Sequence, residues 1–256
     1  MHSQNRPKRK FSVVIPTLNE EVLIPRLLSQ LQNQTYKDFE VCVVDAKSED
    51  DTVKVAKSFL EKMDLQVLVS PKRGVSFQKN YGADQTNGKF LIFLDADIEV
   101  YPSFLSELDT ALTEGGYLSV AANWWRYPGI PLWEKVIMFL GWETSFLTQY
   151  IGKPIGGAGV IIVARNMFEK IGKFDENVKI AEDCLVLQKL QDMGIKTKYL
   201  RKPAVHISQR RIKKDGLPHV LWLYAKSTYY QIRGGDHAKY EVDYQMGGQY
   251  HGKHNK

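Results

Sequence analysis

The sequence predicts an α/β fold with a mostly parallel sheet flanked by helices, and three observations support this prediction. In the first hundred residues, short apolar runs alternate with segments of helical periodicity, in the order strand, helix, strand, helix, strand, helix, strand. The apolar runs lack alternating polar residues, which is typical of strands buried on both faces. No internal repeat or low-complexity tract interrupts this order. A parallel sheet with right-handed crossovers is therefore the economical topology.

The first expected strand is Phe11 to Ile15, and we expect Pro16 to stop it. Asn19 is positioned to cap the helix that follows, and Pro25 is near enough to its start to kink it. The apolar face of this helix is marked by Leu23, Leu27, Leu28 and Leu31.

The next elements continue this alternation. A second strand is expected at Phe39 to Val44, and acidic residues from Glu49 to Asp51 open a second helix. The residues expected to pack from this helix are Val53, Ala56 and Leu60. A third strand, Leu65 to Val69, is followed by a short basic turn and a helix that starts near Ser76.

Two carboxylates follow the fourth strand, which is the segment that organises the chain. Five apolar residues, Phe90 to Leu94, lead directly into Asp95 and Asp97. In open α/β sheets, ligands bind beyond the carboxyl ends of the strands. Paired carboxylates there suit Mg2+ or Mn2+, and either ion suits a diphosphate. Taken alone, the motif also fits two aspartates that simply end a strand.

A second acidic pair, Glu182 and Asp183, precedes a helix in the later part of the chain. The apolar face of this helix is formed by Val186, Leu190 and Met193, and Gly194 is its expected end. Acidic residues also favour a helix start for dipole reasons, so the pair alone does not identify a catalytic base.

Composition places the chain among soluble globular proteins, with 43% hydrophobic and 25% charged residues. A net charge of +6 suits phosphate-bearing ligands or an anionic membrane surface, and we expect no nucleic-acid partner. Cys42 and Cys184 fall in ordered segments, which predicts no disulfide and a reducing compartment. No secretory signal follows the basic start, and no apolar stretch approaches the ~18 residues of a membrane span. A cytoplasmic location is therefore expected.

Residues 124–150 concentrate four of the five tryptophans, namely Trp124, Trp125, Trp133 and Trp142. An apolar stripe at helical spacing comprises Leu132, Val136, Phe139, Leu140 and Leu147. The default expectation is a helix that packs on the core or lines an acceptor groove. The more specific hypothesis is a helix that lies on a bilayer, in peripheral contact with the inner membrane face. A later helix, Pro218 to about Arg233, could join it.

Motifs spread along the chain together resemble family-2 glycosyltransferases, which are nucleotide-sugar-dependent enzymes with the GT-A fold. The first part of the resemblance lies in Val14 to Glu20, Val43 to Asp45, Arg73-Gly74 with Asn80 and Gly82, and Leu94 to Asp97. The second part lies in Gly156 to Gly159, Phe168, Gly172, Phe174 to Glu176, and Glu182-Asp183. The set is far more specific than any single motif because order and spacing match as well.

This resemblance implies an inverting transfer of one sugar from a nucleotide-diphosphate sugar to an acceptor hydroxyl, with Mg2+ or Mn2+ on the diphosphate. Asp183 is implied as general base and Glu182 as a residue that orients substrate or base. Asp97 is implied as the direct metal ligand, and Asp95 as a ligand of ribose or metal-bound water. The expected donor contacts are Pro16, Thr17, Asn19, Glu20, Asp45, Arg73, Asn80 and Asp95. The expected acceptor or closing-loop residues are Gly157, Gly159, Trp124, Trp125, Arg210 and Arg211.

Several of these roles have alternatives. Asp45 is implied as a nucleobase contact but could instead cap a turn, and Arg73 could bind phosphate or be an exposed loop cation. His206 could be a metal or phosphate ligand that completes the site, or a structural residue. The donor could carry UDP, GDP or dTDP, and the acceptor could be a glycan or a lipid-linked molecule.

Two departures from the family pattern bear on mechanism. Residues 46–49 replace a Gly-Ser-rich turn, which leaves the base and ribose contacts open. Residues 209–213 do not match the Gln-x-x-Arg-Trp motif of processive polymerases, so we expect single transfers.

We expect one domain with appended segments. These are a basic tail (1–10), a nucleotide-sugar-binding half (11–115), an acceptor-binding and catalytic half (116–215), a helical extension (216–246) and a disordered tail (247–256).

Other functions predict other features. A sugar nucleotidyltransferase usually carries a Gly-rich phosphate loop after the first strand, but residues 16–21 contain no glycine. A non-catalytic sugar-nucleotide or glycan-binding module would not need the four acidic residues Asp95, Asp97, Glu182 and Asp183. No Gly-x-Gly-x-x-Gly follows the first strand, which counts against a dinucleotide oxidoreductase.

Overall fold

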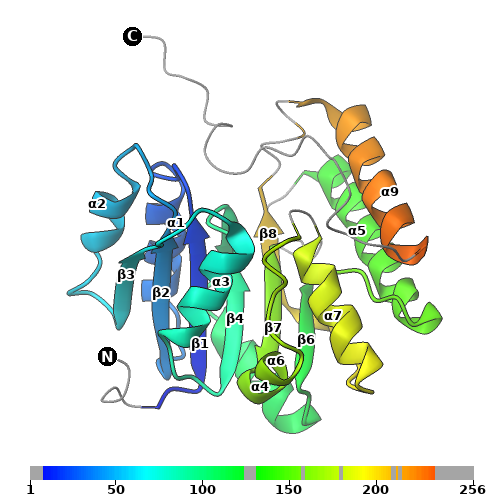
Figure 1. The fold of residues 1–256 in the computed structure, drawn as a ribbon, viewed down its shortest axis with the longest axis horizontal. Coiled ribbons are helices and arrows are strands. Elements are labelled where there is room, and N and C mark those ends of the chain that lie inside the picture. The colour runs from blue at the N-terminus through cyan, green and yellow to red at the C-terminus, as the bar shows by residue number, and fades with distance from the viewer. Residues whose placement is uncertain are drawn as a thin grey trace.

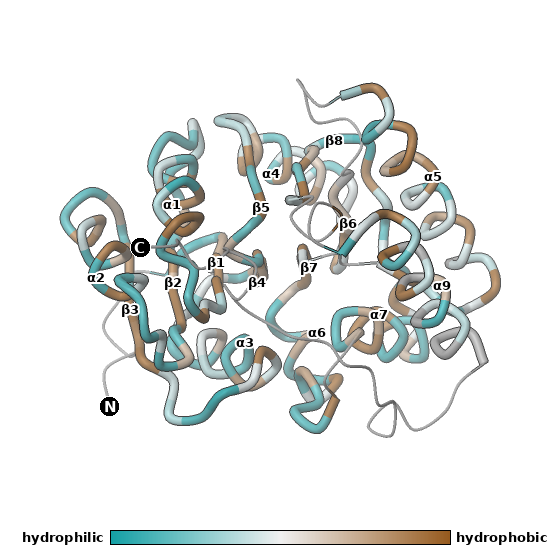
Figure 2. The backbone as a smooth tube through the Cα atoms, turned by 90° about the horizontal axis from the view of Figure 1, so that it is seen from above, coloured by the Kyte–Doolittle hydropathy of each residue, from teal (hydrophilic) through white to brown (hydrophobic). Residues whose placement is uncertain are grey.

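The computed structural model describes residues 8–123, 131–156, 159–178, 181–208, 212 and 215–233. They form an eight-stranded sheet flanked by helices, so the predicted α/β fold class is confirmed (Figure 1). Helices α3, α6 and α7 lie on one face of the sheet, and α1 and α4 lie on the other (Figures 1 and 2).

The sheet order is β3-β2-β1-β4-β7-β6-β8-β5. Strands β1 to β4 are mutually parallel, whereas β7 runs antiparallel to β4 and β6, and β5 runs antiparallel to β8. The strand bounds are β1 Phe11–Thr17, β2 Phe39–Asp45, β3 Leu65–Val69, β4 Phe90–Leu94, β5 Ile98–Val100, β6 Ser119–Asn123, β7 Val160–Ala164 and β8 Lys198–Ile207. Because β1, β2 and β4 are parallel, their carboxyl ends share one edge of the sheet.

The helices connect these strands and cover the sheet. Their bounds are α1 Ile24–Gln32, α2 Thr52–Lys57, α3 Val75–Asp84, α4 Phe104–Gly115, α5 Leu132–Thr148, η1 Gln149–Ile151, α6 Arg165–Lys170, α7 Glu182–Asp192 and α9 Leu217–Arg233. The expected helix from Pro218 to about Arg233 corresponds to α9. None of the described helices is both long and apolar enough to cross a bilayer.

The core lies between the central strands and the helices on both faces. Every residue of β1, β2 and β4 is buried, as their unbroken apolar runs predict. Cys42 and Cys184 are both buried, and no disulfide joins them.

Several local expectations were wrong. Strand β1 continues through Pro16 to Thr17, because proline fits a strand where its missing N–H is not needed. Asn19 does not cap α1, which begins at Ile24 and carries Pro25 in its first turn, where proline needs no kink. The side chains of Leu60 and Met193, which were expected to pack inward, are exposed.

Helix α5 packs on the core, in agreement with the default expectation, but through a different face from the predicted one. Its inward face comprises Glu134, Met138, Trp142, Ser145 and Thr148. Its predicted apolar stripe faces solvent instead, with Leu132 76% exposed and Leu140 58% exposed. Trp142 is buried against Tyr199, whereas Trp133 is half exposed. Helices α5 and α9 lie together at the end of the molecule opposite β3 (Figures 1 and 2).

Candidate active site

Four charged side chains from three parts of the chain meet near the carboxyl end of β4. Lys79 lies on α3, Asp95 follows β4, and Glu182 and Asp183 form the first turn of α7. The Nζ atom of Lys79 lies 2.8 Å from Oδ1 of Asp183 and 3.0 Å from Oε1 of Glu182. The same atom lies 3.8 Å from Oδ1 of Asp95. The structure therefore joins the acidic groups from the two halves of the chain through one lysine.

Helix α3 delivers Lys79 to this point because it is fixed on both sides. A Cβ atom on Gly82 would lie 2.5 Å from Cγ1 of Val14, so this glycine allows α3 to approach β1 closely. The Asn80 side chain exchanges hydrogen bonds of 3.0 and 3.1 Å with the backbone of Phe174. Asn80, which was expected to contact the donor, is thus used to tie α3 to the segment before α7.

Burial and neighbouring charges set the protonation of the cluster. Burial, together with repulsion from Glu182 and Asp95, raises the pKa of Asp183 to about 7, although Lys79 acts to lower it. Burial alone would lower the pKa of Lys79, but Asp183 and Glu182 hold it well above its ordinary value. Lys79 is therefore a permanent cation, and Asp183 can take up a proton near neutrality.

Gly159 sits directly against the first aspartate of the Asp-x-Asp motif. Its carbonyl oxygen accepts a 2.9 Å hydrogen bond from the backbone N–H of Asp95. Its φ of 82° lies in the left-handed region, which favours glycine. The sequence placed Gly159 among acceptor or closing-loop residues, and the structure places it beside the Asp95 carboxylate.

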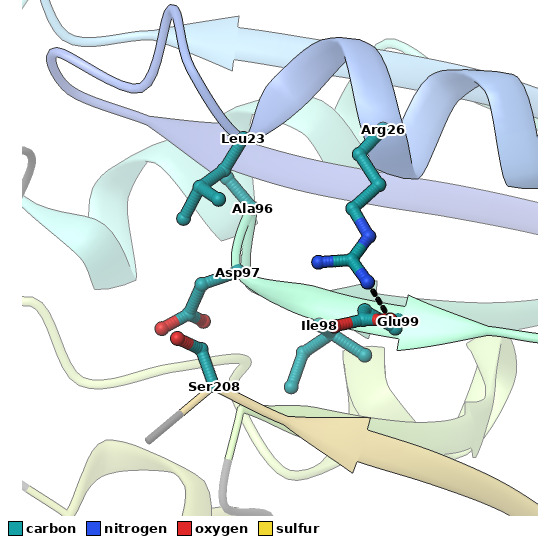
Figure 3. A pocket seen from close by; sticks show the side chains of 7 residues that line it. All are labelled: Leu23, Arg26, Ala96, Asp97, Ile98, Glu99 and Ser208. Carbon is teal, nitrogen blue, oxygen red and sulfur yellow. Dashed lines mark ion pairs between the residues drawn. The ribbon is translucent and has the colours of Figure 1, made fainter. Parts of the chain in front are cut away.

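Asp97 borders an open pocket at the same strand end (Figure 3). The pocket is lined by Leu23, Arg26, Ala96, Asp97, Ile98, Glu99 and Ser208. The side chains of Asp97 and Ser208 point toward each other, and Arg26 forms an ion pair with Glu99 (Figure 3). Asp97 is thus accessible from solvent beside the partly exposed Asp95.

Asp95 and Asp97 fit the donor set of a hard divalent cation. Mg2+ is usually held by one or two carboxylates plus substrate phosphates and water, not by an all-protein cage. Within the described residues, no group of three or more His, Cys, Asp or Glu side chains could hold a metal by itself. The two aspartates therefore suit an ion that is shared with a bound diphosphate.

His206, a candidate metal ligand from the sequence, is held between two buried glutamates. Its Nδ1 atom lies 3.0 Å from Oε1 of Glu99, and its Nε2 atom lies 2.8 Å from Oε1 of Glu134. The hydrogen bond with Glu99 raises the pKa of His206, which favours the imidazolium. Because both ring nitrogens are engaged by carboxylates, this geometry fits the structural alternative, and metal ligation by His206 stays a prediction.

Asp45 is enclosed by its own loop at the end of β2. Its carboxylate accepts hydrogen bonds from Thr17 Oγ1 at 3.2 Å and from the Ser48 backbone N–H at 2.8 Å. Asn19 extends this network, because its side-chain oxygen accepts a 2.8 Å bond from the N–H of Glu49. Asp45 therefore caps the turn, and its contact with a nucleobase stays a prediction.

The remaining donor-side candidates surround this turn. Pro16, Thr17 and Glu20 are buried. Arg73 is exposed, and its Nη2 atom donates to the carbonyl oxygen of Lys47 at 3.2 Å. The loops after β2 and β3 are thereby linked. Trp124, Trp125, Gly157, Arg210 and Arg211 lie outside the described residues, as does the tail 247–256.

Lys79 was not among the residues singled out from the sequence. The sequence did contain a signal for the burial of Lys79, because Ser76, Lys79 and Ala83 recur at the spacing of one helix face. All three are buried in the structure. A lysine on the inward face of a helix next to a family motif is a sign of a buried ion pair.

The chain is similar to known proteins in sequence and in fold. A profile of the family described as Glycosyl transferase family 2 matches residues 12–172. That range includes β1 to β4, the Asp-x-Asp motif and Lys79.

Two relatives are similar to this chain in sequence. A GalNAc(5)-diNAcBac-PP-undecaprenol beta-1,3-glucosyltransferase from Campylobacter jejuni is 39% identical over 118 residues, which cover 44% of this chain and 38% of that protein. A PGL/p-HBAD biosynthesis glycosyltransferase from Mycobacterium bovis is 36% identical over 179 residues, which cover 68% of this chain and 66% of that protein. The chain thus spans less than two thirds of the length of each.

A solved structure supports the fold. The mannosyltransferase PcManGT from Pyrobaculum calidifontis, in complex with GDP-Man and Mn2+, superposes with a TM-score of 0.66 at 20% identity. The match covers 90% of this chain and 66% of that one. This likeness identifies the GT-A type of architecture that the sequence predicted.

Proposed function

This chain belongs to glycosyl transferase family 2, and from that premise we propose that it transfers one sugar from a nucleotide-diphosphate sugar to an acceptor hydroxyl with inversion. The observation that carries this proposal is the convergence of Asp95, Glu182 and Asp183 on Lys79 at the carboxyl end of β4. The donor-side Asp95 and the base-side Glu182 and Asp183 therefore all lie within 3.8 Å of one buried ammonium, which supports a single reaction centre.

In the proposed reaction, the acceptor oxygen attacks the anomeric carbon of the donor sugar. The bond from that carbon to the diphosphate oxygen breaks, and the diphosphate leaves with the electron pair. Asp183 takes the proton of the acceptor hydroxyl. General-base catalysis of this kind typically accelerates a reaction by about 10²–10⁴-fold. Attack opposite the leaving group inverts the anomeric centre. Glu182 lies beside Asp183 and orients the acceptor or the base.

Asp97 and Asp95 are the residues that would hold a divalent ion on the diphosphate. When bound, Mg2+ or Mn2+ neutralises the charge that grows on the leaving diphosphate. The Mn2+ and GDP-Man in the PcManGT structure support this assignment by fold likeness. The donor's nucleotide is a separate question, for which UDP, GDP and dTDP are the candidates.

A lipid-linked acceptor is the finer part of the proposal. The name of the Campylobacter relative specifies an undecaprenol-linked acceptor. The outward face of α5 and η1 supports peripheral membrane contact, because it exposes Leu132, Trp133, Val136, Phe139, Leu140, Leu147, Tyr150 and Ile151. Exposed aromatic and apolar side chains of this kind suit the interfacial region of a bilayer. A soluble glycan acceptor is the competing possibility.

A nucleotide-release assay tests the proposal directly. UDP-, GDP- and dTDP-linked sugars are supplied singly with Mn2+ or Mg2+, with and without a polyprenyl-phosphate-linked acceptor. We expect one nucleotide class to be released, with metal dependence and with stimulation by acceptor. Binding of a sugar nucleotide without release would favour a non-catalytic module. Release of pyrophosphate from a nucleoside triphosphate and a sugar phosphate would favour a nucleotidyltransferase.

A further inference from the structure

We infer that Lys79 is a positioning residue for the transfer reaction, which fixes Asp183 and Glu182 in place relative to Asp95 through its ammonium group. This inference rests on the proposed function, because it takes Asp183 to be the general base. Lys79 does not touch the reacting atoms in this account, and it acts through the carboxylates that it contacts.

The contacts of Lys79 leave little freedom in the arrangement. An ammonium group has three donors, and two of them are used by Asp183 and Glu182 at 2.8 and 3.0 Å. Oδ1 of Asp95 lies 3.8 Å from Nζ, and the centroid of the Phe174 ring lies 5.2 Å from it. These partners belong to three segments, because Glu182 and Asp183 both lie in α7, so one side chain bridges the end of β4 and the start of α7.

Charge explains why a cation is needed at this point. Glu182 and Asp183 would place two negative charges side by side with little access to water, and the partly exposed Asp95 adds a third nearby. Lys79 is 1% exposed, and its contacts with Asp183 and Glu182 involve side chains that are each 11% exposed. Like charges in a buried site disfavour ionisation, and one ammonium offsets part of that repulsion. Lys79 thereby helps to keep Asp183 ionised and able to accept a proton.

The start of α7 has no side-chain cap, and Ala181, which precedes it, has a φ of 61°. The Lys79 contacts of Glu182 and Asp183 therefore add to the buried packing of Cys184 and Val186 in holding the first turn of α7. A helix terminus held in this way can present Asp183 in one orientation.

The alternative is an ion pair that stabilises the fold and has no part in the reaction. Removing one partner of a buried ion pair is strongly destabilising, so loss of stability alone does not distinguish the two accounts. The discriminating readouts are turnover at saturating donor, the pH profile and rescue by a conservative substitution.

The experiment compares Lys79→Met and Lys79→Arg with Lys173→Met as a control. Lys173 pairs with Asp84, the last residue of α3, outside the site, so its substitution removes a lysine ion pair of α3 without touching Asp183. Turnover and donor affinity are measured for each variant, and folding is checked by thermal melting. Lys79→Gln replaces the methionine variant if the latter does not fold.

We expect Lys79→Met to lose at least about 100-fold in kcat while its donor Kd changes by less than about threefold. Lys79→Arg should recover kcat to within about tenfold of wild type, because it restores the positive charge. The acid limb of the kcat profile should move to higher pH in Lys79→Met, because a charge that lowers the pKa of Asp183 is gone. Lys173→Met should match wild type.

A double variant separates this inference from the proposed function. If Lys79 acts through Asp183, Lys79→Met should cause little further loss in an Asp183→Asn background. Near-wild-type kcat in folded Lys79→Met, or an unmoved acid limb, would overturn the positioning role while leaving the proposed function intact. Full activity in Asp183→Asn alone would instead overturn the base assignment on which the inference rests.

Discussion

Gly159 and Asp95 are in such close contact that a Cβ atom on Gly159 would lie 2.6 Å from Oδ2 of Asp95. Real Cβ atoms do not approach an oxygen this closely, so the side chain of Asp95 must shift if position 159 carries any other residue. The start of β7 therefore shapes the Asp-x-Asp end of β4, and the two halves of the site depend on each other.

Replacing Gly159 with alanine tests this dependence. Gly159→Ala adds positive-φ strain of about 1–2 kcal/mol and also displaces the Asp95 carboxylate. Gly172→Ala is the matched control, because Gly172 has a similar φ of 78° but no atom near its Cβ position. Both variants should lose comparable stability in thermal melts, and only Gly159→Ala should lose metal-dependent nucleotide binding. Equal binding by the two variants would contradict a role for this contact.

Removing the Asp97 carboxylate should abolish metal-dependent binding of a nucleotide diphosphate. The side chain is partly exposed and borders the pocket of Figure 3, so Asp97→Asn should leave the fold intact. A thermal-shift panel of UDP, GDP and dTDP with and without Mn2+ measures this, since a ligand at about 100 times its Kd stabilises by ~2.7 kcal/mol. Asp192→Asn, at the far end of α7, is the control. An unchanged Mn2+ dependence in Asp97→Asn would show that the ion is held elsewhere.

The rate of transfer should depend on pH through Asp183. Because burial raises the pKa of Asp183 to about 7, the residue is ionised above that pH and protonated below it. Only the ionised form accepts a proton, so kcat should fall as the pH drops below about 7. Donor affinity measured over the same range is the control, and it should change less. A kcat that stays constant down to about pH 5.5 would be inconsistent with a base of this kind.

The exposed face of α5 should bind anionic membranes. Leu140→Glu places a charge within that face and should reduce co-sedimentation with phosphatidylglycerol-containing vesicles by about tenfold, the value of one buried leucine. Leu60→Glu is the control, because Leu60 is similarly exposed but follows α2 on another part of the molecule. Binding should weaken at high salt. If wild-type protein does not co-sediment at low salt, the soluble-acceptor alternative gains support.

The sequence predicted the parts of the site that depend on local pattern. The unbroken apolar run of β4 predicted a strand that is buried on both faces. Asp95 and Asp97, which follow it directly, were therefore expected at its carboxyl end. Helix α7, with its acidic first turn, was likewise predicted from its apolar periodicity and from Gly194 at its expected end. Both features need only the nearest residues for their explanation.

The features that were missed depend on partners far away in the sequence. Lysine is ordinarily a surface residue, and the burial of Lys79 is explained only by acids more than a hundred residues further on. Glu134 is buried because His206 meets it, and that contact turns the apolar stripe of α5 outward. A rule that places apolar faces inward cannot anticipate such pairing.

The most direct test of the account is the effect of Asp183→Asn on transfer and on donor binding. The substitution keeps the size of the side chain and removes its ability to accept a proton. Asp192→Asn, in the same helix, again serves as control. The account predicts that Asp183→Asn binds the donor nucleotide with a Kd within about threefold of wild type and loses about 10²–10⁴ in kcat. Turnover close to that of wild type in Asp183→Asn would contradict it.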